Sequence, residues 1–300
     1  MTQGISAVII TLNEEKNIAN AILSVRSWVQ EIIVVDMMSE DGTQEIARSL
    51  GAVVKVTPRV PAFDGARLIG VERATFEWIL MLDADEMVPV SLSRELVRVA
   101  TLDLADVCQV PRLNFILGRP MLHGLHGPHG DFQIRFSKKD KLNLSDRVHS
   151  FVSTVGKPRV RRIEFSKFGA IHHFHAASAS QLIEKMNRYT TIEAEQLLSE
   201  SRLGAPWRVF ILAPLMFIRS FLLHSGWRDG WRGLYWAWLM GFNRVTREAK
   251  HLHLTLQRAK QLPIAPYSEE AARILLEYRV PSDIGPDTHL PAASEGIGRG

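Results

Sequence analysis

The sequence contains very little cysteine. Among its 300 residues only Cys108 carries a thiol. One thiol excludes an internal disulfide and a zinc site built from cysteines, and it is consistent with a reducing cytoplasm. A basic segment is also lacking at the N-terminus, where residues 1–4 contain no Lys or Arg and the apolar run over 5–12 is short. We therefore expect a first strand there, with no signal peptide visible.

The excess of one charge over the other is also small. Lys and Arg number 36 against 32 Asp and Glu, which gives a net charge of +4 and an isoelectric point near 9.3. This mild excess fits an anionic substrate or an anionic membrane surface and does not require nucleic acid. With 46% hydrophobic and 23% charged residues, the chain can bury a substantial core.

Strand and helix signals alternate through the first hundred residues. The expected strands are 5–10, 31–36, 52–56 and 78–83, and the expected helices between them are 17–28, 44–50 and 66–75. Repeated units of this kind with short connections predict an α/β fold, in which helices cover both faces of a mostly parallel sheet.

After the first hundred residues the pattern changes to shorter segments rich in Gly and His. Seven of the eleven histidines lie within 123–175. Residues 178–201 then carry the spacing of one long amphipathic helix, with Ser178 or Ser180 as its N-cap. The last residues, 280–300, are rich in Pro, Gly and small side chains, and we expect them to be disordered.

An apolar run over 78–82 stops abruptly at three carboxylates, those of Asp83, Asp85 and Glu86. The run is typical of a buried parallel strand, and open α/β sheets place their ligands beyond the carboxyl ends of such strands. Two aspartates one residue apart at that position can reach a divalent cation, and their oxygen atoms suit Mg²⁺ or Mn²⁺ better than zinc. An Asp-x-Asp by itself is more often a solvated turn, so the neighbouring motifs decide between the two interpretations.

Seven motifs in one order carry a family resemblance. They occupy residues 8–15, 33–36 with 39–43, 82–86, 131–136, 148–149, 171–174 and 184–190. In these motifs the chain resembles the family-2 glycosyltransferases, which have the GT-A fold. Among them it is most similar to the lipopolysaccharide core transferases, a group that includes the enzyme adding β-glucose to inner-core heptose. The resemblance covers about two thirds of the chain, and it implies a catalytic GT-A domain over 1–203 and a helical, membrane-associated region over 204–279.

The resemblance also implies which residues bind the substrate and the cation. The positions that match the family's donor-binding residues are Thr11, Asn13, Glu14, Asp36, Arg67 and Asp83. Asp85 and His173 match the ligands of a bound Mn²⁺ or Mg²⁺, and the implied donor is a UDP-sugar. From the residues alone, Asp36 could simply end a strand, and His173 could be a hydrogen-bonded structural histidine. Leu68 stands where the family usually has an Asn after its arginine.

An inverting transfer requires a general base that accepts the proton of the acceptor hydroxyl. Asp131, which lies between a Gly-rich turn and a strand, is the predicted base, and Asp146 and His149 are the alternatives. Two polar side chains on the following strand, Gln133 and Arg135, are predicted to contact the acceptor or a phosphate. The relatives usually have His-Glu where this chain has His149 followed by Ser.

Two unusually apolar segments, 207–223 and 234–242, follow the long helix. Buried helices are one interpretation. A transmembrane pair is a poor one, because Pro214 and Arg219 interrupt the first segment and the second is far shorter than the ~20 residues that span a bilayer. Tryptophans and arginines crowd this region, namely Trp207, Trp227, Trp231, Trp236 and Trp238 with Arg208, Arg219, Arg228 and Arg232. This mixture favours helices that lie in the headgroup zone of an anionic membrane.

The sequence therefore predicts an inverting, metal-dependent glycosyltransferase that moves a sugar from a nucleotide-diphosphate donor to a lipid-linked glycan such as a lipopolysaccharide core. It would be a cytoplasmic protein, peripheral on the inner face of a bacterial cytoplasmic membrane. A catalytically degenerate relative that binds a glycolipid or a partner protein is the main alternative. A sugar nucleotidyltransferase is a weaker one, because Asn-Glu-Glu at 13–15 occupies the place of that class's Gly-rich loop.

Overall fold

A computed structural model describes residues 2–59, 63–143, 153–202, 204–260 and 266–277. The chain divides into two compact units, 1–252 and 253–300. The first unit contains the sheet and the candidate site. In the second unit the structure describes the end of helix α8 and helix α9 (Pro266–Glu277). The tail over 280–300, predicted to be disordered, lies outside the described residues.

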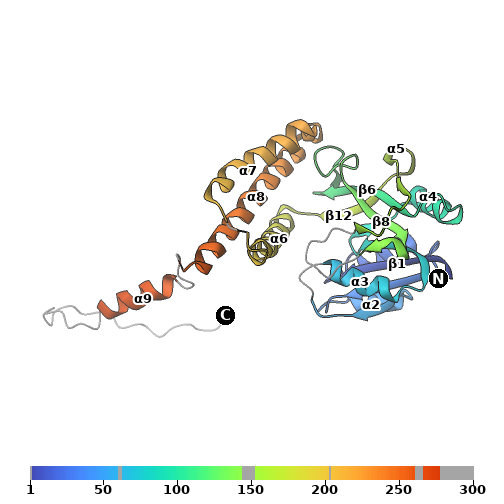
Figure 1. The fold of residues 1–300 in the computed structure, drawn as a ribbon, viewed down its shortest axis with the longest axis horizontal. Coiled ribbons are helices and arrows are strands. Elements are labelled where there is room, and N and C mark those ends of the chain that lie inside the picture. Colours follow the sequence, from blue (N-terminus) through green and yellow to red (C-terminus); the bar gives the residue numbers. More distant parts are fainter. Residues whose placement is uncertain (1, 60–62, 144–152, 203, 261–265, 278–300) are drawn as a thin grey trace, which may run out of the picture. The chain divides into compact units, whose positions relative to one another are not determined.

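A single large sheet forms the centre of the first unit (Figure 1). Its main path runs in the order β3-β2-β1-β4-β8-β6-β12-β5, and β7 and β11 pair with β6. The strands are β1 (Thr2–Thr11), β2 (Glu31–Asp36), β3 (Val53–Val56), β4 (Phe76–Asp83), β5 (Glu86–Met87), β6 (Val107–Ile116), β7 (Arg119–Pro120), β8 (Phe132–Lys138), β11 (Val160–Arg162) and β12 (Ile171–Ala176). A separate small ladder joins β9 (Leu142–Asn143) to β10 (Ser153–Thr154).

The sheet is mixed. Its N-terminal half is parallel, because β1 pairs in parallel with both β2 and β4, and β2 with β3. Strand β8 runs antiparallel between β4 and β6, whereas β12 is parallel to β6. The register places Thr11 beside Asp36 and Ile10 beside Asp83, so that the polar ends of three strands lie at one edge.

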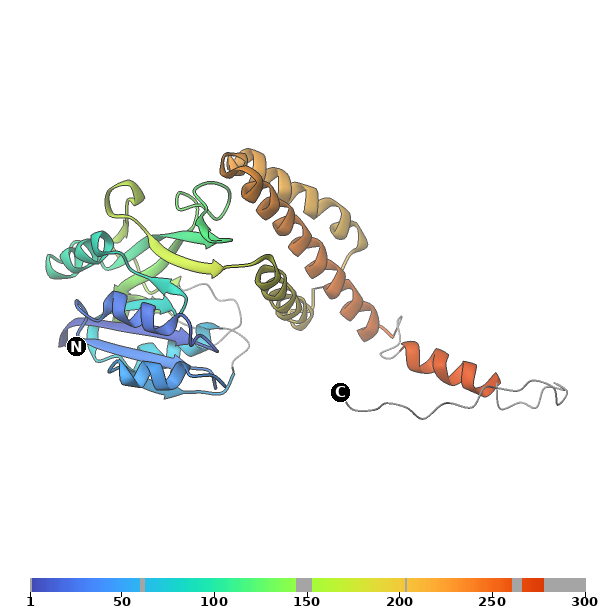
Figure 2. The same cartoon turned by 180° about the vertical axis from the view of Figure 1, so that it is seen from behind.

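Helices cover both faces of the sheet, which confirms the predicted α/β class (Figure 2). Alternate residues of β1 belong to different cores, because successive side chains of a strand point to opposite faces. Ile9 packs in a core with α1 (Ile18–Val25), α2 (Thr43–Ser49) and α4 (Val90–Thr101), whereas Val8 packs in a core with α3 (Phe63–Arg73). Gly70 lets α3 lie against the sheet, since a Cβ there would overlap Val8.

The long amphipathic helix predicted over 178–201 is α6 (Ala179–Ser199). Its N-cap is Ser178, whose hydroxyl accepts a hydrogen bond from the backbone N–H of Gln181 at 3.2 Å. Leu182 and Met186 of α6 belong to a third apolar core, which also contains Ile116 of β6 and Trp236 of α8. This core connects the sheet with the helices that follow.

The first apolar segment forms one continuous helical stretch. Helix α7 (Pro206–Ile218) contains Pro214 in its interior and passes directly into a π-helical turn over Arg219–Leu223. Pro214 and Arg219, which interrupt the apolar run in the sequence, therefore lie within one continuous helical stretch. A short 3₁₀ turn, Gly226–Asp229, leads into the long helix α8 (Gly230–Arg258). The two helices pack against each other, with Phe217 and Trp238 rings 4.9 Å apart.

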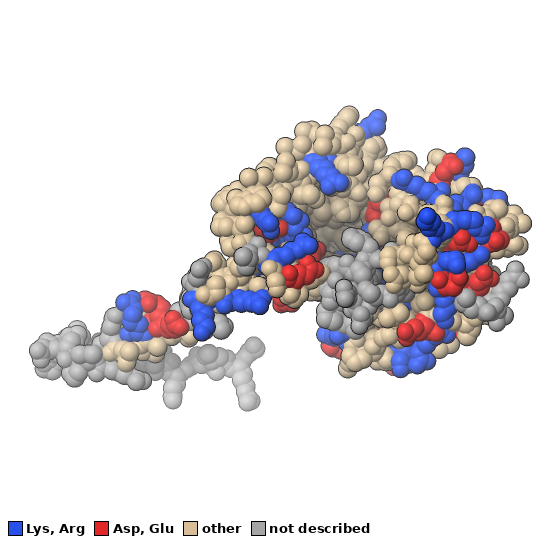
Figure 3. All heavy atoms as spheres, in the orientation of Figure 1, with Lys and Arg blue, Asp and Glu red and all other residues tan. Residues whose placement is uncertain are grey.

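Much of the apolar surface of this helical pair is exposed. Phe210 of α7 is 77% exposed. Figure 3 shows few charged side chains over α7. Large apolar side chains that are similarly exposed are Trp207, Ile211, Leu215, Ile218, Leu222, Leu223, Trp227, Trp231, Leu234, Trp238 and Phe242. Within the described ranges one helix, Pro206–Leu223, is long and apolar enough to cross a membrane.

Candidate active site

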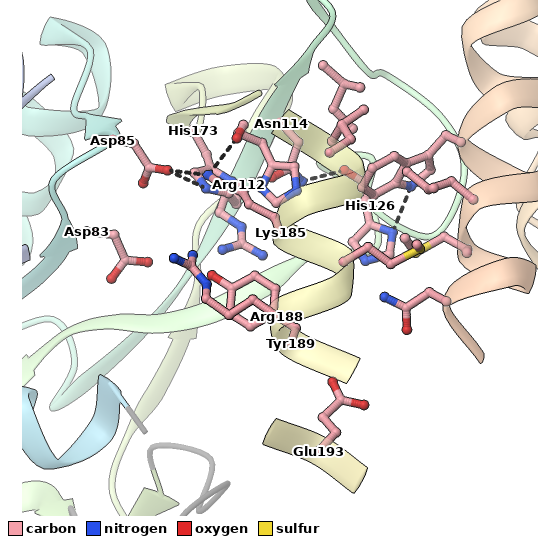
Figure 4. A pocket seen from close by; sticks show the side chains of 18 of the residues that line it. Asp83, Asp85, Arg112, Asn114, His126, His173, Lys185, Arg188, Tyr189 and Glu193 are labelled. Carbon is pink, nitrogen blue, oxygen red and sulfur yellow. Dashed lines mark hydrogen bonds and ion pairs between the residues drawn. The ribbon is translucent and has the colours of Figure 1, made fainter. Parts of the chain in front are cut away.

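Two neighbouring cavities lie at the carboxyl ends of β1 and β4. The first has a volume of about 490 Å³ and is lined by Asp83, Asp85, His173 and residues of α6 and α8 (Figure 4). The second, of about 810 Å³, is lined by the loop after β1 and by α6. Both are lined by Glu14, Asp85 and Lys185, so they form one polar cleft above the strand ends.

Asp83 is held by two arginines. Its carboxylate accepts hydrogen bonds from Arg67 at 2.6 Å and from Arg135 at 2.8 Å. Burial opposes ionisation of Asp83, but these guanidinium groups outweigh it and lower the pKa of the carboxyl well below its usual range. Asp83 is thus a fixed carboxylate on the cavity wall, paired with Arg67 and Arg135, the two arginines predicted to contact substrate.

Asp85 lies between a histidine and a lysine. Its Oδ2 is 3.4 Å from Nε2 of His173 and 3.3 Å from Nζ of Lys185. Burial again opposes ionisation, but His173 and Lys185 lower the pKa of the Asp85 carboxyl. Both predicted metal ligands therefore meet on one side of the cavity, as Figure 4 shows.

Behind His173 lies a buried polar network. Nδ1 of His173 is 2.6 Å from Oδ1 of Asn114, and Nδ2 of Asn114 donates to Oδ2 of Asp131 at 3.0 Å. Asp131 also accepts from Arg112 at 2.9 Å and from Gln133 at 2.8 Å. Burial would raise the pKa of Asp131, but these donors lower it. Asp131 is buried and is not among the residues that line the two cavities.

The donor-binding residues predicted at the ends of β1 and β2 differ in their access to the cleft. Thr11 lines the first cavity, Asn13 the second and Glu14 both, whereas Asp36 lines neither. Burial raises the pKa of Glu14. Asp36 is fully buried, and its Oδ1 accepts from Gln44 at 2.7 Å. Its Oδ2 and the neighbouring hydroxyl of Thr11 are buried without a hydrogen-bond partner among the described residues.

The residues predicted to contact the acceptor are paired with carboxylates inside the protein. Gln133 and Arg135 both project toward carboxylates, Gln133 toward Asp131 and Arg135 toward Asp83 and Glu86. Glu86 is fully buried and accepts from Arg135 at 2.7 Å, so it is not a solvated acid. The two alternative bases, at positions 146 and 149, lie outside the described residues.

The pair Asp85 and His173 is suited to a hard divalent cation. One carboxylate oxygen and one imidazole nitrogen converge from β12 and the loop after β4, and Mg²⁺ or Mn²⁺ sites commonly complete such a set with water and substrate phosphate oxygens. No cluster of three or more His, Cys, Asp or Glu ligands occurs within the described ranges. Within the part of the chain that the structure describes, Asp85 and His173 are thus the two candidate ligands.

Four cavity residues were given no role from the sequence. Lys185 and Arg188 lie one turn apart on α6 and line both cavities, and Arg112 and Asn114 extend from β6 into the first cavity. The spacing of the two α6 cations within the motif at 184–190 was a usable signal. Asn114 had none, because its importance comes from its register partner His173 on β12.

The sequence comparisons agree with this geometry. The model of glycosyl transferase family 2 matches residues 6–162, which carry the strand ends described above. The chain belongs to this family. It is therefore a glycosyltransferase.

Curated relatives extend the similarity beyond the family-2 domain. An uncharacterized glycosyltransferase of Rickettsia felis is 30% identical over 273 residues, covering 86% of this chain and 92% of that protein. The lipopolysaccharide core biosynthesis glycosyltransferase LpsC of Rhizobium meliloti is 25% identical over 263 residues, with coverage of 86% and 92%. Among solved structures, Staphylococcus aureus TarS 1-349 in complex with UDP aligns over 87% of this chain and 92% of that chain at 14% identity, with a TM-score of 0.44.

Proposed function

We propose that this family-2 glycosyltransferase transfers a sugar, with inversion and with the help of a divalent cation, from a nucleoside-diphosphate donor to a lipid-linked glycan of the lipopolysaccharide-core type. One observation carries the proposal. Asp85 and His173 converge to 3.4 Å beside Asp83, in a cavity at the carboxyl ends of parallel strands.

The donor occupies the cleft above β1 and β2 in this proposal. Asp36 Oδ2 and Thr11 Oγ1 are buried polar atoms without partners in the described structure, and they lie side by side at the sheet edge. Buried polar groups are normally hydrogen-bonded, so unpaired ones favour a ligand there. We expect the nucleoside beside Thr11, which lines the first cavity. Contact with Asp36, which is fully buried and lines neither cavity, stays a prediction from the resemblance. UDP is the nucleotide expected.

The diphosphate lies beside the α6 cations. Lys185 and Arg188 line both cavities, and in Figure 4 Arg188 projects from α6 toward the space between Asp83 and Asp85. Cations at this place stabilise the negative charge that develops on the departing nucleoside diphosphate. Asp85 and His173 would hold the Mn²⁺ or Mg²⁺, which supplies further charge neutralisation for that leaving group when bound.

The acceptor enters from the side of α7 and α8. Met216, Leu239 and Met240 line the apolar part of the first cavity, and Arg244 and Arg247 line it further along α8. Together with the exposed apolar surface of α7, this wall suits an amphipathic, anionic glycolipid. In this proposal the protein binds the cytoplasmic face of the inner membrane, with α7 lying in the headgroup zone.

The test is release of nucleoside diphosphate from a panel of nucleotide sugars in the presence of bacterial envelope glycolipids. We expect one donor to be turned over, loss of turnover with a chelator, recovery with Mn²⁺, and a loss of about 10³-fold in Asp85→Ala. Equal turnover by wild type and Asp85→Ala would contradict the metal dependence. Donor binding without turnover would favour a degenerate, glycolipid-binding relative.

A further inference from the structure

The orientation of one buried amide has consequences for the cation site. Asn114 lies on β6 and is 3% exposed. Its Nδ2 is 2.8 Å from the carbonyl oxygen of His126 and 3.0 Å from the carboxylate of Asp131. Neither partner has a hydrogen to donate, so the NH₂ group must face them and the amide oxygen must face His173.

This orientation sets the tautomer of His173. The amide oxygen of Asn114 is 2.6 Å from Nδ1 of His173 and can only accept, so Nδ1 must carry a hydrogen. In the neutral ring the lone pair then sits on Nε2, the nitrogen that lies 3.4 Å from Asp85 on the cavity side. A lone pair and a carboxylate that face each other repel unless a positive charge lies with them. Lys185, 3.3 Å from the same Oδ2, supplies one, and a divalent cation between Nε2 and Oδ2 would supply another.

Both carboxylate oxygens of Asp131 accept hydrogen bonds within this network. Arg112 and Asn114 both donate to its Oδ2, and Gln133 donates to its Oδ1. Asp131 as a whole residue is 7% exposed and lines neither cavity. A general base must reach the proton of the acceptor hydroxyl directly or through one water. Asp131 instead reaches the amide that holds His173.

We infer that Asn114 and Asp131 are positioning residues, which fix the tautomer and the direction of His173 so that its Nε2 binds the divalent cation together with Asp85. The inference rests on the metal dependence proposed above. It also gives Asp131 a different role from the general base predicted by the sequence. Partners of this kind behind a metal-bound histidine contribute substantially to metal affinity.

The first experiment measures Mn²⁺ affinity by electron paramagnetic resonance of the full chain in the presence of UDP. We expect Asp131→Asn and Asn114→Leu to weaken Mn²⁺ binding by about 10- to 100-fold. Gln109→Leu, on the same strand but outside the network, should bind as the wild type does. Unchanged Mn²⁺ affinity in Asp131→Asn would overturn this inference but not the proposed metal dependence. Absence of Mn²⁺ binding by the wild type would overturn the proposed metal dependence and this inference with it.

A second readout separates positioning from proton transfer. If Asp131 orients His173, excess Mn²⁺ should restore most of the transfer activity of Asp131→Asn. If Asp131 is the base, activity should stay low at every Mn²⁺ concentration, which would contradict the inference. Nitrogen-15 NMR of labelled, metal-free protein at pH 8 reports the tautomer, with His173→Gln to assign the signal. We expect the Nδ1–H form in the wild type and its loss in Asn114→Leu; the same tautomer in both would also contradict the inference.

Discussion

Two apolar helices of the first unit use their side chains in opposite ways. Helix α1 buries every residue of its apolar stripe, with Ile18 and Ile22 fully enclosed under the sheet. Helix α7 is nearly as apolar, yet none of its residues, all described, is buried. Apolar side chains spaced on one face specify packing against a core, whereas those spread around a helix leave a surface that requires another environment.

The largest expected contrast is in stability. Ile22 is fully buried in α1, whereas Ile211 of α7 is 50% exposed. We expect Ile22→Ala to lower the free energy of unfolding by about 2–5 kcal/mol, because it leaves a cavity in the core. Ile211→Ala should change it by less than about 0.5 kcal/mol. Urea denaturation of both variants measures this, and equal losses would show that α7 is packed in solution.

Membrane binding should show the reverse contrast. Replacing Phe210 of α7 and Leu223 of the π-helical turn, which are 77% and 75% exposed, with Glu removes two large apolar groups from this surface. We expect vesicles that contain anionic lipid to be bound at least about tenfold more weakly, because each buried side chain of this size is worth about 1.5–3 kcal/mol. Val53→Glu, at an exposed position of β3, is the control. Sedimentation with vesicles measures the binding. Equal binding by the wild type, the double variant and the Val53→Glu control would exclude this surface as the membrane-binding site.

Helix α6, which connects the sheet with helices α7 and α8, depends on its N-cap for stability. Ser178 accepts the N–H of Gln181 at the start of α6, so Ser178→Ala should cost about 1 kcal/mol of unfolding free energy. Ser180→Ala is matched to it, since Ser180 lies in the first turn and is not the cap. Urea denaturation that gave the two variants the same stability would contradict the cap.

The smallest expected effect is a dependence on pH. Trp236 of α8 donates its indole N–H to Nδ1 of His126 at 3.1 Å, and burial lowers the pKa of His126. The unfolded chain therefore binds a proton at His126 more readily than the folded protein does. As a result, the free energy of unfolding falls as the pH drops through ~6.5, the pKa of His126 in the unfolded chain. We expect a loss below about 1 kcal/mol between pH 7 and 6.

The variant His126→Gln checks the source of this loss. Because Gln does not titrate, the stability difference between wild type and His126→Gln should shrink as the pH falls from 7.5 to 6. Denaturation curves measured at both pH values test the prediction. A difference that grew toward acid pH would mean that His126 is charged in the folded protein.

Local patterns predicted much of the fold and part of the site. Apolar runs that end in polar residues specified β1, β2 and β4, and parallel pairing then brought Thr11, Asp36 and Asp83 to one edge. The N-cap of α6 was narrowed to Ser178 or Ser180, two side chains that can accept at such a position, and the structure identifies Ser178. These features depend on neighbours in sequence or on one repeated strand pairing, so they could be derived before the structure.

Contacts between distant strands could not be derived in this way. Arg135 reaches Asp83 and Glu86 only because β8 inserts antiparallel beside β4, a pairing that no local pattern encodes. Asn114 meets His173 through the register of β6 and β12.

The central claim is that the strand-end carboxylates and His173 bind a nucleoside diphosphate through a cation. Calorimetric titration of UDP into the metal-free protein, with and without Mn²⁺, tests it most directly. The account predicts that Mn²⁺ tightens UDP binding at least about tenfold in the wild type and has no such effect in Asp85→Ala. UDP binding of equal strength with and without Mn²⁺ in both proteins would contradict it.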